Sequence, residues 1–176
     1  HLGSCVINSL LIVYASTRGI EDSIGLYFTV YAIAMIISRP FVSKLVDKFG
    51  FIKVGIPAII LEGASFVIIG FAGRLWMFLV AAVVFAVGYG SMLPVLQSLC
   101  MKSVPAERRG SASCTNFIAL DVAMIVGPVI AGSIADKAGY STMWFSMLVP
   151  IILSIVLILV TQKWLNNIEK NFESQD

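Results

Sequence analysis

Long apolar stretches, separated by short polar ones, run along nearly the whole chain. A helix that crosses a lipid bilayer needs about 20 consecutive, mostly apolar residues, and six stretches approach this length. We therefore predict an all-α membrane protein with six transmembrane helices in a bundle over residues 1–162, followed by a polar tail over 163–176. The predicted spans are 1–16, which looks a few residues short, then 24–42, 54–72, 75–100, 110–135 and 142–161.

The composition agrees with a protein that is surrounded by lipid. Of the 176 residues, 59% are hydrophobic and 12% are charged, whereas an average soluble domain is roughly 45–50% apolar and 25% charged. The net charge of only +2 gives no reason to expect nucleic acid as a partner. The three cysteines lack CxxC spacing, which favours helix packing over a disulfide or metal site.

Lysine and arginine concentrate in alternate connections between the predicted spans. They are Lys44, Lys48 and Lys53 in the second connection, Lys102, Arg108 and Arg109 in the fourth, and Lys163 at the start of the tail. By the positive-inside rule these three segments face the cytoplasm. The prediction is a multi-pass protein of the cell membrane with a cytoplasmic tail.

Two segments of the chain echo each other, 45–51 (LVDKFGF) and 134–140 (IADKAGY). Each lies between the second and third helix of a three-helix set, and an odd number of spans separates them. This arrangement is typical of an inverted-topology repeat of three plus three helices. Chance is the alternative, because Asp-Lys-x-Gly ends a helix well in any protein.

Segment 43–51 (SKLVDKFGF) resembles the cytoplasmic loop signature of the major facilitator superfamily, Gly-x-Leu-a-Asp-basic-x-Gly-basic. Leu45, Asp47, Lys48 and Gly50 match the signature, while positions 43 and 51 depart from it. Segment 105–110 (PAERRG) is similar to a loop of the efflux-type members of this superfamily. Four residues of the fifth span are similar to the eleventh helix of those members: Asp121, Gly127, Pro128 and Gly132.

The resemblance covers the whole chain and implies half of a major-facilitator fold, the carboxy-terminal six helices of a twelve-helix transporter. Its partner would be a missing amino-terminal half of the same chain. The short first span and the start at His1 instead of Met favour this interpretation. The alternative is a free-standing six-helix scaffold or assembly subunit that transports nothing.

Two acidic residues lie deep within predicted spans. Asp121 is 12 positions into the fifth span, near the middle of a hydrocarbon core about 30 Å thick. A charge there costs roughly 2.5–3.5 kcal/mol, so such an acid faces a cavity or a partner. Asp121 is the stronger candidate for proton coupling, and a structural hydrogen bond is the alternative. Glu62, at similar depth in the third span, is the weaker candidate, because in the family the third helix of a half is peripheral.

Other polar residues are assigned through the resemblance. It implies a cytoplasmic gate that holds one access state, formed by Arg39, Asp47, Lys48, Gly50, Arg108 and Arg109, although these charges could simply set the topology. In the family the first, second, fourth and fifth helices of a half line the central cavity. Their polar residues, each of which could instead form an interhelical hydrogen bond, are Asn8, Tyr31, Gln97 and Asn116.

Small residues recur every four positions in the fourth and fifth spans, and this spacing favours close helix packing. The ladders contain Gly90 and Gly127, and Pro94 and Pro128 are expected to kink the same helices.

No enzyme motif, cofactor or metal site is expected. His1 is the only histidine, and no phosphate-binding loop is present. We therefore predict secondary active transport of a small molecule by alternating access, most simply proton antiport that drives efflux of an amphipathic or drug-like compound.

Overall fold

The computed structural model describes the backbone of residues 2–19 and 24–173, and their side chains except at positions 43, 47, 51, 102, 106 and 162–173. Within these ranges the chain is helical, without strands. The elements are α1 (Leu2–Thr17), α2 (Gly25–Phe49), α3 (Phe51–Phe71), α4 (Leu75–Lys102), the 3₁₀ turn η2 (Ala106–Arg108), α5 (Arg109–Ala138), α6 (Tyr140–Ser146) and α7 (Leu148–Glu173).

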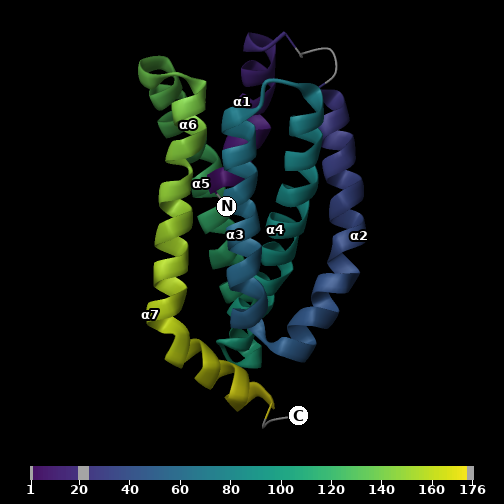
Figure 1. Ribbon diagram of the computed structural model, residues 1–176. Coiled ribbons are helices and arrows are strands. Elements are labelled where there is room, and N and C mark those ends of the chain that lie inside the picture. Colours follow the sequence, from purple (N-terminus) through teal and green to yellow (C-terminus); the bar gives the residue numbers. More distant parts are fainter. Residues whose placement is uncertain (1, 20–23, 174–176) are drawn as a thin grey trace.

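The helices form one elongated bundle (Figure 1). Five segments of the described chain are long and apolar enough to cross a membrane: Gly25–Val46, Ile52–Phe71, Leu75–Met101, Arg109–Ala138 and Tyr140–Thr161. The last of them joins α6 to the first part of α7, and α7 then continues through most of the predicted tail to Glu173. The remaining apolar helix, α1, has 16 residues and is shorter, as the sequence predicted.

The α2–α3 connection, the α4–α5 connection and the last turns of α7 lie at the lower end of the bundle (Figure 1). The α3–α4 and α5–α6 connections lie at the upper end. The three segments that are rich in lysine and arginine therefore share one end, as a positive-inside topology requires.

The two echoing segments have the same backbone geometry. Gly50 separates α2 from α3 with φ 83° and ψ 164°, and Gly139 separates α5 from α6 with φ 83° and ψ 160°. Each glycine donates its N–H to the carbonyl oxygen four residues earlier. Gly50 donates to Val46 and Gly139 donates to Ala135, both at 2.9 Å. Only glycine adopts this region without strain. The shared geometry at opposite ends of the bundle confirms the repeat of three plus three helices.

Aromatic side chains fill the core and join five helices. Ring centroids lie 5.6 Å apart for Tyr31 and Phe85, 5.9 Å for Phe85 and Phe66, 6.2 Å for Phe66 and Trp144, and 5.9 Å for Trp144 and Tyr14. Rings at such distances gain stabilisation beyond their buried area. The outside of the bundle is apolar too: Ile36, Ile125 and Val160 are 71%, 70% and 77% exposed. A surface of this kind suits a lipid environment.

Small residues bring the helices into close contact. The buried residues of α5 are Ala123, Gly127, Ala131 and Ala135, four positions apart. Gly127 lies against Leu2 and Cys5 of α1, and Gly90 of α4 lies against Met35 of α2. These close approaches hold α5 to α1 and α4 to α2.

Candidate functional site

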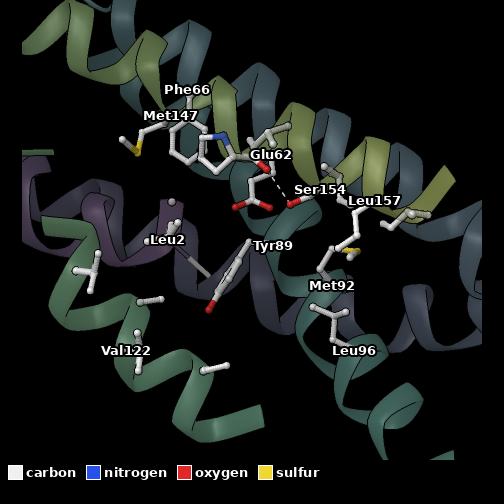
Figure 2. A pocket seen from close by; sticks show the side chains of 18 residues that line it. Leu2, Glu62, Phe66, Tyr89, Met92, Leu96, Val122, Met147, Ser154 and Leu157 are labelled. Carbon is white, nitrogen blue, oxygen red and sulfur yellow. Dashed lines mark hydrogen bonds between the residues drawn. The ribbon is translucent and has the colours of Figure 1, made fainter. Parts of the chain in front are cut away.

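A cavity of about 530 Å³ lies among α1, α3, α4, α5 and α7 (Figure 2). α3, α4, α5 and α7 contribute side chains at helical spacing, such as Ile59, Glu62 and Phe66 on α3, and α1 contributes Leu2 and Gly3. Most of the described residues that line it are apolar; the polar ones are Glu62, Tyr89 and Ser154, and none carries a positive charge. The cavity is therefore an apolar space with a single acidic group.

Glu62 projects its carboxyl group into this cavity, between Tyr89, Leu2 and Ser154 (Figure 2). Its side chain is only 9% exposed. The start of α1 packs against it, since a Cβ atom added to Gly3 would lie 3.2 Å from Glu62 Oε1. An acid held so far from water is expensive unless it is neutral or paired.

The other polar side chains of the cavity are held by their own surroundings. Ser154 Oγ donates to the Pro150 carbonyl at 2.8 Å, the hydrogen bond drawn in Figure 2. The Tyr89 ring stacks on Phe85, with centroids 5.3 Å apart and planes 5° from parallel. Glu62 is therefore the carboxylic acid among the described residues that line the cavity.

Asp121 is exposed on α5 and does not line this cavity. The cavity-facing residues of α5 are Ala119, Val122, Ala123 and Val126; at about 100° per residue, Asp121 points about 150° away from their mean direction. The structure thus places the two intramembrane acids on different faces and does not bring them into one site.

The four polar residues expected along the central cavity do not line the cavity around Glu62. Asn8 is exposed, whereas Gln97 and Asn116 are half-buried. The half-buried Tyr31 is part of the aromatic core, where its ring stacks with Tyr27 at a centroid distance of 6.5 Å. Contact with a substrate remains a prediction for these residues.

Lys48, Gly50, Arg108 and Arg109 lie at the lower end of the bundle, whereas Arg39 lies within α2, ten residues before its end at Phe49. The side chains of Arg39, Lys48, Arg108 and Arg109 are exposed. Arg39 Nη2 lies 3.5 Å from Met35 Sδ. Lys48 Nζ lies 5.4 Å from the centroid of the Phe49 ring. The side chain of Asp47 lies outside the described residues, so the pairing that would form the gate stays a prediction. Pro94 is exposed within α4 and Pro128 is half-buried within α5.

The sequence analysis missed Gly88, which positions Glu62. A Cβ atom at Gly88 would lie 2.7 Å from both the Ala58 carbonyl oxygen and the Glu62 amide nitrogen. The backbones of α3 and α4 therefore touch beside the acidic residue. The sequence signal for this contact was Gly88 itself, a second glycine two positions before Gly90. It lies on a different face of the same helix and so indicates a second close helix approach.

A second missed cluster lies at the upper end. Tyr14 Oη lies 3.4 Å from the Gly70 carbonyl and 3.5 Å from the Ala72 carbonyl, and it accepts a hydrogen bond from Arg18 Nη2 at 3.1 Å. The same nitrogen donates to Ser141 Oγ at 3.3 Å. This cluster ties the end of α1 to the α3–α4 connection and to α6.

The fold, the repeat and the loop signature all agree with a family-level comparison: the family model of the Major Facilitator Superfamily matches residues 2–173. The chain belongs to the Major Facilitator Superfamily. The superfamily consists of membrane transporters rather than enzymes, and the apolar helices are those of a multi-pass membrane protein. The described helices agree with half of its fold.

Several curated relatives carry the names of efflux proteins. The chain is 30% identical to the multidrug export protein EmrB of Haemophilus influenzae over 158 residues, which are 89% of this chain and 31% of that protein. It is 22% identical to the class B tetracycline resistance protein of Escherichia coli, over 97% of this chain and 41% of that protein. It is 27% identical to the multidrug resistance protein MdtG of Proteus mirabilis, over 81% of this chain and 37% of that protein. This superfamily chain thus spans between about a third and two fifths of the length of these relatives.

Proposed function

We propose that this chain is the carboxy-terminal half of a secondary transporter that exports an amphipathic or drug-like compound in exchange for protons. The printed names of the relatives, two for multidrug and one for tetracycline resistance, support efflux. The half would rock against a second six-helix half, so that a central site opens to one side of the membrane at a time. The lysine-rich lower end would face the cytoplasm.

The observation that carries this proposal is a buried carboxylic acid in an apolar cavity of the helix bundle. The carboxyl of Glu62 is buried in a cavity whose described walls are otherwise almost entirely apolar and carry no cation. Such walls suit an amphipathic molecule, and a single acid favours a cationic or neutral compound over an anion. A group that is charged in one state and neutral in another lets protons shift the balance between two conformations.

Asp121 is the proposed coupling residue, because a carboxylate at this position is unsuitable for lipid contact. It lies at mid-span on an exposed face of α5 beside the exposed side chains of Phe117, Ile118 and Ile125. A charge facing hydrocarbon there would cost roughly 2.5–3.5 kcal/mol, so this face is expected to turn toward a partner or a watered cavity. In an alternating-access transporter such a cavity lies between the two halves.

The test uses the complete transporter, reconstituted in liposomes, with an imposed pH gradient and a lipophilic cation dye. Asp121→Asn removes the ionisable group with little change in shape, and we expect at least a tenfold loss of the response to the gradient. Glu62→Gln is expected to raise the KM for the cation more than it lowers the maximal rate. Asp136→Asn, at the exposed end of α5, is the matched control and should behave as the parent.

Unchanged gradient dependence in Asp121→Asn removes this residue from the coupling role. If the parent protein moves no dye and no other amphipathic compound under any gradient, the efflux proposal itself is wrong.

A further inference from the structure

An apolar groove runs along α2 on the side of α4 away from the Glu62 cavity. Its upper part, about 470 Å³, lies between α2 and α4, and its lower part, about 300 Å³, lies among α2, α3 and α4. The two parts share Val42, Leu45 and Val87, so they form one continuous hollow. Pro40 interrupts the hydrogen-bond ladder of α2, and α2 curves toward α3 in its lower half (Figure 1).

The groove is long enough to hold an acyl chain of a lipid. It extends along α2 from Ala34 to Phe49, which is about 22 Å at 1.5 Å per residue. One leaflet of the hydrocarbon core is about 15 Å deep, half of the total of about 30 Å. A chain that enters from the lower end would therefore stay inside the groove through its own leaflet.

The chemistry of the walls excludes a polar occupant. The hydroxyl groups in the groove belong to Ser38 and Ser91, and each donates to a carbonyl of its own helix, that of Met35 at 3.1 Å and that of Val87. The other described residues that line the groove are apolar, apart from Lys53 at its lower end. The occupant must then be apolar along its length.

Positive charge gathers where the groove ends. Lys53 lines the opening with an exposed side chain, and the side chains of Lys44 and Lys48 are exposed on the adjoining turns of α2. Asp47 is the acidic residue of this segment, so the lysines leave a net positive charge. Basic residues between helices at a membrane surface bind anionic lipid head groups.

We propose that this groove is a binding site for an anionic phospholipid of the membrane, with an acyl chain along α2 and the phosphate at Lys53. The proposal goes beyond the transport function and does not depend on it. It assigns a role to Lys53 that neither a gate nor a topology signal would require.

The test compares two lipids that have the same acyl chains and different head groups, phosphatidylglycerol and phosphatidylcholine. The complete protein, purified in neutral detergent, is mixed with both, and native mass spectrometry counts the lipid molecules retained. We expect the parent to prefer phosphatidylglycerol and Lys53→Gln to lose about fivefold of this preference, equivalent to about 1 kcal/mol for one lysine near an anionic surface. Lys137→Gln, an exposed lysine near the opposite end of the bundle, is the matched control and should keep the preference.

A second variant tests the groove apart from the charge. Val87→Phe fills the hollow where its two parts meet, and it should reduce retention of both lipids. Equal retention of the two lipids by the parent, an unchanged preference in Lys53→Gln, or full retention in Val87→Phe would each overturn the proposal. Displacement of phosphatidylglycerol by soluble glycerol phosphate would also overturn it, because it would show a site for free phosphate.

Discussion

Replacing Gly88 with alanine tests how closely α3 and α4 approach beside the buried acid. The added methyl group would lie 2.7 Å from the Ala58 carbonyl oxygen and 2.7 Å from the Glu62 amide nitrogen. Both are backbone atoms, so no side-chain rotation can relieve the overlap. The helices must separate by roughly 0.7 Å to restore an ordinary contact of 3.4 Å.

The expected cost of this change follows from two opposing effects. Forcing an extra group into a packed interior costs typically 1–3 kcal/mol, whereas alanine favours a helix over glycine by roughly 0.5–1 kcal/mol. The net result should be a destabilisation of about 1–2 kcal/mol, together with a displaced Glu62. Gly110→Ala is the matched control, because Gly110 also lies in a helix and has open space around it.

The measurement is thermal unfolding of the purified complete protein in detergent, followed by tryptophan fluorescence. Gly88→Ala should lower the unfolding temperature, and Gly110→Ala should leave it unchanged or raise it slightly. If Gly88→Ala is as stable as the parent, α3 and α4 do not meet backbone to backbone at this position and the reasoning is refuted.

Three further predictions follow from the remaining geometry. Gly50→Ala and Gly139→Ala should each destabilise the protein by about 1–3 kcal/mol in the same unfolding assay, because both positions have φ 83°; a neutral result at either would contradict the shared repeat geometry. Tyr14→Phe should cost about 0.5–1.5 kcal/mol through loss of the hydroxyl contacts with the Gly70 and Ala72 carbonyls and with Arg18, and an unchanged unfolding temperature would show that these contacts add nothing. Single cysteines at Lys48 and Lys137, in a background without native cysteines, should react with membrane-impermeant reagents from opposite sides of the membrane, and labelling from the same side would refute the topology.

Much of the fold was predictable because the relevant signals are one-dimensional. Span lengths follow from the thickness of the bilayer, and the sidedness of the lysines follows from their positions in alternate connections. The paired Asp-Lys-x-Gly segments predicted the repeat, since a helix that must stop and restart within one residue needs glycine. In the structure the basic connections share one end of the bundle (Figure 1), and Gly50 and Gly139 have the same φ of 83°; which side of the membrane that end faces stays a prediction.

The orientation of side chains around each helix was decided only by the tertiary structure. In a soluble protein the polar face of a helix marks its outside, but here both faces are apolar because the outside meets lipid. The sequence therefore placed Glu62 and Asp121 at similar depth without showing that one lines an internal cavity and the other lies on an outer face. The same lack of contrast hid the contact at Gly88 and the cluster around Tyr14, since both depend on which helices are neighbours and not on hydrophobic periodicity.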